Sequence, residues 1–307
     1  MPRTEPPASD QNRAPLILAS FADNGIMTID CSLTVVGSIN ADITATTSRL
    51  PAAGETVGGG RLSRSPGGKG ANQAAAAARL GARTRMIGAV GPDTDGQAML
   101  QALRAAGVRI DAIAEATAET GAALIMVDAD GENQIAVCEG ANAEVSLDGV
   151  EFSPDEAVLT QLEISLDLIA ELADRVPGFL AVNAAPALPL PAEVVDRADL
   201  IIVNEFEYSQ LPQLKTARLV AVTYGAKGSA LLRNGEQIAF AEAVRATPVS
   251  TVGAGDAYCA ALTIGLTSGL EPERALRAAN AVGAAAVEVA SAQPEFDRLE
   301  TYLPALD

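Results

Sequence analysis

A single carboxylate, Asp256, follows directly after the small residues Gly253, Ala254 and Gly255. The apolar residues 257–262 predict the first turns of a helix, and uncovered N–H groups at a helix N-terminus favour a bound anion. Since a carboxylate beside a phosphate is disfavoured by charge, Asp256 suggests a general base that takes a proton from the group attacking the phosphate. The alternative is a glycine-rich turn whose aspartate only caps the helix.

The chain contains no histidine in its 307 residues. This excludes mechanisms that need an imidazole base or ligand, including Ser-His-Asp hydrolysis and the common zinc sites. Proton transfer would fall to Asp, Glu, Lys, Tyr or Cys. Cys31, Cys138 and Cys259 are far apart and in no Cys-x-x-Cys spacing, which indicates a reducing compartment, the cytoplasm.

The formal net charge of −18 argues against nucleic acid or an anionic membrane as a partner, although a nucleotide needs only a local positive site and a metal ion. The apolar content of 49% and the length allow one large α/β domain or two small ones. No apolar run approaches the ~20 residues of a membrane span. We expect residues 1–31 to be a disordered tail and residues 32–307 to form one domain.

Short apolar runs alternate with Ala-, Leu- and Arg-rich helical stretches from Leu33 onward. This pattern is typical of a mostly parallel sheet with helices on both faces, a three-layer αβα fold. The predicted strands are 33–37, 85–90, 157–162, 179–182, 200–203 and 219–222. The predicted helices are 71–80, 95–106, 166–175, 255–267 and 272–290.

A polar residue follows nearly every predicted strand, and these residues are Asn40, Glu163, Asn183, Asn204 and Thr223. Ligands of open parallel sheets bind at the carboxyl ends of the strands, so we expect these side chains to line one crevice. Glu163 is the hardest of them to explain without a function, because burying an unpaired carboxylate is costly.

Two segments interrupt the alternation, residues 42–65 and 120–138. Both resemble β-ribbons, and the second predicts a hairpin that turns at residues 128–131. Residues 122–127 are apolar at both even- and odd-numbered positions, so the side chains on both faces of this strand require burial. We expect a small β lid that covers the site with one face and a second copy of the chain with the other, as a homodimer. The alternative is one more core strand.

A second glycine cluster, residues 66–73, opens the Ala-rich helix. It is not a Walker A loop because Gly70 follows Lys69, and no segment fits the Gly-x-Gly-x-x-Gly fingerprint. With both fingerprints excluded, the cluster predicts a tight turn that brings the backbone close to a small polyhydroxylated ligand, with Lys69 and Asn72 beside it.

Several motifs, in order along the chain, resemble the ribokinase family of sugar kinases over residues 33–294. They lie at residues 37–42, 67–73, 161–163, 204–207, 223–228 and 253–256. The first two, together with residues 131–133 and 140–143, are most similar to the ribose-directed branch rather than to its fructose- or nucleoside-directed relatives. The resemblance favours the catalytic interpretation of Asp256.

The resemblance implies a role for each matching residue. The sugar hydroxyls would be held by Asn40, Asp42, Gly68, Lys69, Asn72 and Glu163, with Asp256 as the base and Gly253, Ala254 and Gly255 as the anion hole. The nucleotide would contact Asn204, Thr223, Gly225, Gly228 and Asn280, and Asn204 and Glu207 would face Mg²⁺ through water. Lys69 as a solvated loop charge and Asn280 as a polar position on a helix are the alternatives.

The family also implies a monovalent-cation site, K⁺ in particular. By matching position its ligands would come from Ser250, Val252, Ala286, Val289, Ser291 and Glu295. The family usually has Asp where this chain has Ser250, so we expect weak K⁺ activation, with Glu295 as the one candidate to compensate.

Two further positions depart from the family. Residues 183–186 read Asn-Ala-Ala-Pro where Asn-Pro-Ala-Pro is usual. Only 15 residues separate Glu207 from Thr223, which predicts a connection and one strand with no helix between them.

The resemblance therefore predicts ATP-dependent phosphorylation of D-ribose at its 5-hydroxyl, with Mg²⁺ as cofactor. A kinase of the same mechanism for deoxyribose, a ketose or a hexose is the nearest alternative. A non-catalytic sugar-binding protein on the same fold is the other, and the intact residues 253–256 argue against it.

Overall fold

The computed structural model describes residues 29–303. Within this range, nine strands form one large sheet, whose central strands pair in parallel while β12 and β13 form an antiparallel edge. The order across the sheet is β13 (Glu236–Ala241), β12 (Ser229–Arg233), β11 (Val220–Thr223), β10 (Leu200–Asn204), β9 (Leu180–Asn183), β8 (Ala157–Gln161), β1 (Ser32–Val36), β4 (Arg83–Val90) and β5 (Arg109–Glu115). The predicted α/β fold is confirmed.

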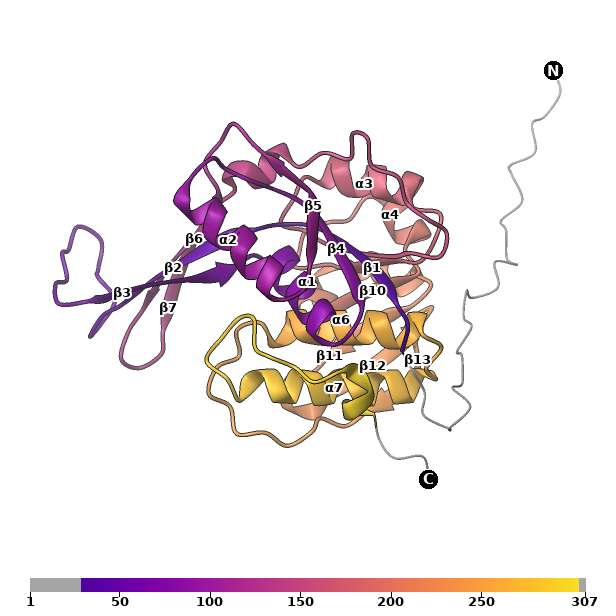
Figure 1. The fold of residues 1–307 in the computed structure, drawn as a ribbon. Coiled ribbons are helices and arrows are strands. Elements are labelled where there is room, and N and C mark those ends of the chain that lie inside the picture. Colours follow the sequence, from indigo (N-terminus) through magenta and orange to yellow (C-terminus); the bar gives the residue numbers. More distant parts are fainter. Residues whose placement is uncertain (1–28, 304–307) are drawn as a thin grey trace, which may run out of the picture.

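Helices cover both faces of this sheet (Figure 1). One core packs between the sheet and α1 (Lys69–Arg79), α2 (Thr94–Ala105), α6 (Ala254–Thr267) and α7 (Pro272–Val287). The other packs beneath α3 (Leu166–Arg175), α4 (Ala192–Arg197) and α5 (Glu205–Gln210). Neighbouring strand residues such as Val35 and Val36 point into opposite cores, as the two-residue period of a strand requires.

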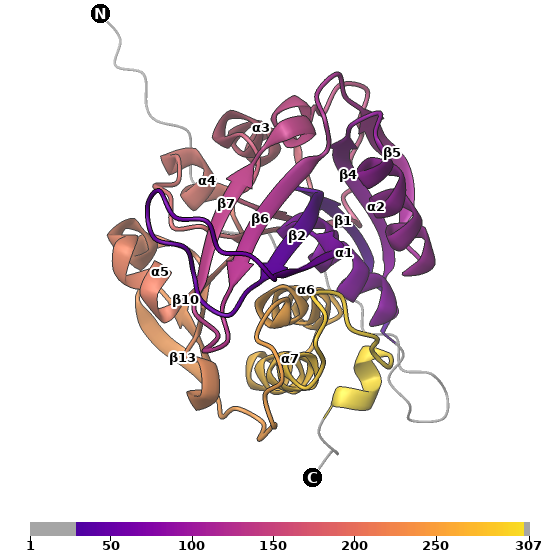
Figure 2. The ribbon, with the colours of Figure 1, turned by 90° about the vertical axis from the view of Figure 1, so that its left-hand side faces the viewer.

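A separate four-stranded sheet, which we call the lid sheet, projects from one side of the larger sheet (Figures 1 and 2). Its order is β3 (Arg61–Gly67), β2 (Asn40–Thr46), β6 (Gly121–Val127) and β7 (Asn133–Cys138). The predicted hairpin is present, because Asp128 N–H donates to the Glu132 carbonyl oxygen at 3.0 Å as β6 turns into β7. The two segments that interrupted the alternation thus form one sheet.

Two predictions along the chain need correction. The connection from Glu207 to Thr223 contains a short 3₁₀ helix, Pro212–Thr216, because α5 begins directly at the end of β10 and leaves room for it. Most of the predicted tail, residues 1–28, lies outside the described residues. Ile29 and Cys31, within the predicted tail, are buried in the core, so the folded part begins before residue 32.

No helix within residues 29–303 combines the length and apolar composition that crossing a bilayer requires.

Candidate active site

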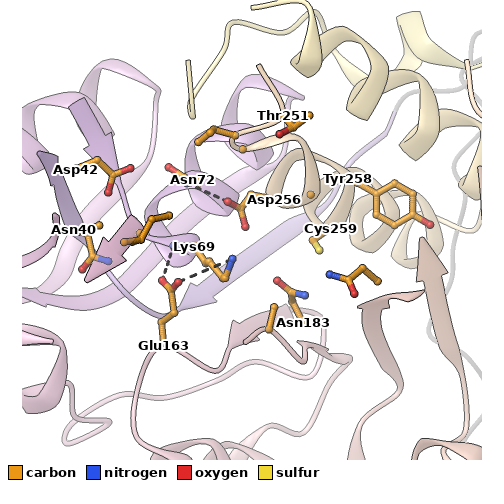
Figure 3. A pocket seen from close by; sticks show the side chains of 18 of the residues that line it. Asn40, Asp42, Lys69, Asn72, Glu163, Asn183, Thr251, Asp256, Tyr258 and Cys259 are labelled. Carbon is orange, nitrogen blue, oxygen red and sulfur yellow. Dashed lines mark hydrogen bonds and ion pairs between the residues drawn. The ribbon is translucent and has the colours of Figure 1, made fainter. Parts of the chain in front are cut away.

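One cavity of about 470 Å³ lies at the carboxyl ends of the parallel strands (Figure 3). The lid sheet lines another side of it, through alternate residues such as Ala123, Ile125 and Ile135. All five polar residues that follow the predicted strands line the cavity, namely Asn40, Glu163, Asn183, Asn204 and Thr223. The prediction that these strand ends form one crevice is confirmed.

Asp256 lies in the first turn of α6 and is 8% exposed at the cavity wall. Its Oδ2 accepts a hydrogen bond from Asn72 Nδ2, and its Oδ1 accepts one from Gln73 Nε2, both at 3.0 Å. Burial raises the pKa of this carboxyl to about 6, against the opposing effects of Lys69 and the two amide donors. A carboxylate with a pKa close to neutrality suits a general base.

The backbone around Asp256 has the geometry of an anion site. Gly253 is the residue before the helix and adopts a left-handed conformation, with φ of 79°. The first N–H groups of a helix have no partner within the helix, and Gly253 and Gly255 both line the cavity. These residues could therefore stabilise negative charge next to the carboxylate of Asp256.

The residues predicted to hold the sugar all line the same cavity as Asp256, and they are Asn40, Asp42, Gly68, Lys69, Asn72 and Glu163. Glu163 is not an unpaired carboxylate, because its Oε2 accepts from Ser38 Oγ at 2.6 Å and from the Lys69 N–H at 3.0 Å. Gly68 has φ of 86°, and a Cβ on it would lie 2.7 Å from the Asn40 backbone nitrogen. The turn therefore requires glycine to bring α1 this close to β2.

Charges in the cavity perturb one another. Burial, then the carboxylates of Glu163 and Asp256, raise the pKa of Asp42 to about 6, while Lys69 lowers it. Burial alone would lower the pKa of Lys69, but Asp256 and Glu163 outweigh it and the pKa is raised. Lys69 is thus a retained cation among three acids, and perturbed groups of this kind cluster at functional sites.

The residues predicted to contact the nucleotide fall into two groups. Asn204, Thr223 and Glu207 line the cavity, whereas Gly225, Gly228 and Asn280 are not part of its lining. The Asn280 side chain accepts from Ser229 Oγ at 2.8 Å and donates to the Ala241 carbonyl oxygen at 3.0 Å, so it ties α7 to β12 and β13.

Asn204 and Glu207 form a reciprocal cap at the start of α5. Asn204 Oδ1 accepts from the Glu207 N–H at 2.8 Å, and Glu207 Oε2 accepts from the Asn204 N–H at 2.7 Å. Each side chain still has atoms free to face a hydrated ion. Residues 29–303 contain no cluster of three His, Cys, Asp or Glu side chains that could hold a metal.

The positions that match the cation site lie in two segments that contact each other. The N–H groups of Val249 and Ser250 both donate to the Val287 carbonyl oxygen, at 2.7 and 3.0 Å, at the end of α7. Three other predicted ligands lie within four residues of Val287 in the sequence, namely Ala286, Val289 and Ser291. Glu295 is 84% exposed and pairs with Arg79 at 2.8 Å.

Sequence reasoning assigned no role to several buried amides that support the site. Gln73 contacts Asp256 directly. Asn142 donates from Nδ2 to Asn40 Oδ1 at 2.7 Å and accepts from the Ile39 N–H. The available signal was the pair Asn72-Gln73 at the start of an otherwise Ala-rich helix, where polar side chains require partners.

Comparisons with known proteins agree with this geometry. The sequence pattern of the pfkB family carbohydrate kinases matches residues 31–298. The chain is 38% identical over 266 residues to a ribokinase of Bacillus subtilis, covering 81% of this chain and 90% of that protein. It is 34% identical over 306 residues to a ribokinase of Arabidopsis thaliana, covering 89% and 80%.

The fold is also that of solved ribokinases. A structure of Arabidopsis thaliana ribokinase complexed with ribose and ATP superposes with a TM-score of 0.81 at 32% identity, covering 89% of this chain and 97% of that one. A Thermotoga maritima ribokinase gives the same TM-score at 26% identity, covering 89% and 99%. Since the family pattern spans residues 31–298, and both the αβα fold and these relatives agree with it, this chain belongs to the pfkB family of carbohydrate kinases.

Proposed function

We propose that this ATP-using kinase transfers a phosphoryl group to the 5-hydroxyl of D-ribose, giving D-ribose 5-phosphate. The observation that carries the proposal is one cavity in which Asp256 and the first turn of α6 meet the polar side chains of β2, α1 and the end of β8. Relatives named ribokinase at 38% and 34% identity support ribose as the sugar.

In this mechanism Asp256 accepts the proton of the sugar's 5-hydroxyl as that oxygen attacks the terminal phosphorus of ATP. The bond from this phosphorus to the bridging oxygen breaks, and ADP leaves with that oxygen. Backbone N–H groups of Gly253, Ala254 and Gly255 stabilise the charge on the transferring group. Asn40, Asp42, Asn72 and Glu163 offer paired acceptors and donors, which suit vicinal hydroxyls.

ATP would contact Asn204 and Thr223 in the cavity, with Gly225, Gly228 and Asn280 beyond it. When bound, Mg²⁺ supplies positive charge that neutralises the phosphates. Asn204 and Glu207 would hold its water shell. Their role toward the ion does not conflict with the cap they form on α5, because each keeps free polar atoms.

Ribose should exceed 2-deoxyribose and fructose in kcat/KM by about 10- to 100-fold, since a polar group left unpaired in the site is costly. ADP release would be measured with a panel of pentoses, hexoses and inosine under one set of conditions. A clear preference for a hexose or the nucleoside would overturn ribose as the substrate and leave the kinase assignment intact. No turnover of any sugar would favour a binding protein.

We propose a homodimer formed through the outer face of the lid sheet. On that face Leu124 is 46% exposed and Leu62 is 63% exposed, so a single chain leaves apolar area open to water. Sedimentation at micromolar concentration should give a dimer, and Leu124→Arg should give a monomer. Ile238→Arg, at a residue of similar exposure on β13, is the control and should leave the dimer intact. A monomeric wild-type chain would refute the proposal.

We propose that K⁺ activates the enzyme weakly. Ser250 stands at the position of the family's aspartate, so the site lacks that formal charge, while Ser250→Asp should strengthen K⁺ activation. Initial rates would be compared in K⁺, Na⁺ and a bulky ammonium salt at matched ionic strength. Tight, saturating activation of the wild-type enzyme by K⁺ would contradict the expected weakness.

We also propose a reducing, cytoplasmic setting. Cys31, Cys138 and Cys259 are all free thiols. Such thiols persist where the compartment keeps them reduced.

A further inference from the structure

A chain of buried amides runs from the centre of the large sheet to Asp256. Gln73 Nε2 donates to Asp256 Oδ1 and to Asn183 Oδ1, both at 3.0 Å. Gln161 Nε2 donates to Gln73 Oε1 at 2.7 Å. Asn183 Nδ2 donates to the Ile202 carbonyl oxygen at 3.1 Å. The chain thus links β8, β9 and β10 through α1 to the first turn of α6.

The direction of every hydrogen bond in this chain is fixed. An ionised carboxylate only accepts, so the NH₂ group of Gln73 must face Asp256 and its oxygen must face Gln161. The backbone oxygen of Ile202 fixes Asn183 in the same way. Rotating any of these amides by 180° would bring two donors or two acceptors together, which makes the arrangement rigid.

Contact with a ligand does not explain these glutamines. Gln73 and Gln161 are both 0% exposed, and neither lines the cavity. Space for Gln161 exists only because residue 37 is glycine, since a Cβ there would lie 1.9 Å from Gln161 Oε1. Burying two glutamines costs free energy in a core where apolar side chains would pack as well. Their hydrogen bonds lead to Asp256, directly from Gln73 and through Gln73 from Gln161, and this link accounts for their presence.

We propose that Gln73, fixed by Gln161 and Asn183, is a positioning residue that aims the carboxylate of Asp256 at the sugar hydroxyl. This inference rests on the proposed role of Asp256 as the base. Asn72 occupies one acceptor position on Oδ2 and Gln73 one on Oδ1, which leaves a further position on each oxygen for the substrate's proton.

The test replaces Gln73 by Met, which has similar length but no donor. With ribose and ATP, Gln73→Met should lower kcat by about 10- to 100-fold, the effect of losing one hydrogen bond to a charged group. The KM for ribose should stay within about threefold of the wild-type value, because losing a group that does not touch the sugar changes little ground-state binding. Gln161→Met should also lower kcat, but by less. It replaces Gln73→Met as the test if that variant fails to fold.

The pH profile separates positioning from a merely structural role. A hydrogen bond to the ionised form lowers a pKa, so losing the Gln73 donor raises the pKa of Asp256 above about 6. The acidic limb of kcat/KM should therefore move to higher pH in Gln73→Met. The other groups that face Asp256 are unchanged between the variants, so the difference reports Asp256 itself; these groups are Lys69, Glu163, Asp42 and Cys259.

Thr160→Val is the matched control. Thr160 precedes Gln161 on β8, is fully buried, and its Oγ1 has no hydrogen-bond partner among the described residues. This variant should keep the wild-type kcat and pH profile. A Gln73→Met enzyme with wild-type kcat and an unmoved acidic limb would overturn the inference alone, whereas an active Asp256→Asn enzyme would overturn the proposed base and the inference with it.

Discussion

Replacing Asp256 by Asn should lower kcat by about 10²- to 10⁴-fold, the usual contribution of a general base. Asn keeps the size of the side chain but cannot accept the proton of the sugar hydroxyl. The KM for ribose should change far less, because Asn40, Asp42 and Glu163 are untouched. Since histidine is absent from the whole chain, no imidazole can replace the lost base.

The experiment compares Asp256→Asn and Asp256→Ala with Asp167→Asn, in ribose and ATP at saturating concentrations. Asp167 also lies in the first turn of a helix, α3, so it controls for the loss of a negative charge at a helix N-terminus. Asp167→Asn should retain wild-type turnover. Turnover of Asp256→Asn above about a tenth of the wild-type value would exclude Asp256 as the base, since a general base contributes far more.

The sequence predicted the parts of the fold that carry a local signal. The strands that became β1, β8 and β10 are short apolar runs flanked by helical periodicity, and each is buried on both faces. The hairpin of β12 and β13 was missed although its turn, Asn234-Gly235, is a typical two-residue signal with φ of 52° and 78°.

The site was predictable only in part, for a physical reason. Asp256, Lys69 and Asn72 lie in the first helical residues after glycine-rich turns, where residue type and spacing already imply close approach to a ligand. The support of Asp256 by Gln73 joins residues 183 positions apart, and its link to Gln161 depends on how α1 packs on the sheet. No local pattern encodes such a contact, because a buried glutamine in an Ala-rich helix can meet many partners.

The anion site itself depends on a residue that tolerates no side chain. Gly253 has φ of 79°, a conformation that costs an L-residue about 1–2 kcal/mol. A Cβ on it would lie 2.2 Å from the Ala292 backbone oxygen, so the start of α6 or the segment around Ala292 must move. The next residue, Gln293, donates to Asn72 Oδ1 at 3.1 Å, and Asn72 donates to Asp256, so such a shift would also reach the base.

Alanine keeps the backbone N–H, but the shift would move the N–H groups of this turn away from the phosphate. Gly253→Ala should therefore lower kcat by about 10²- to 10³-fold, as much as the loss of one donor of an anion hole. Gly149→Ala is the control, because Gly149 has a similar φ of 70° and no atom lies within 4 Å of the position of its Cβ. Both variants carry the strain of a left-handed alanine, so both should unfold at a lower temperature than the wild-type chain, but only Gly253→Ala should lose turnover. Steady-state kinetics with ribose and ATP and thermal unfolding would be measured on the same preparations. Equal turnover of the two variants would mean that the backbone at Gly253 contributes nothing to phosphoryl transfer.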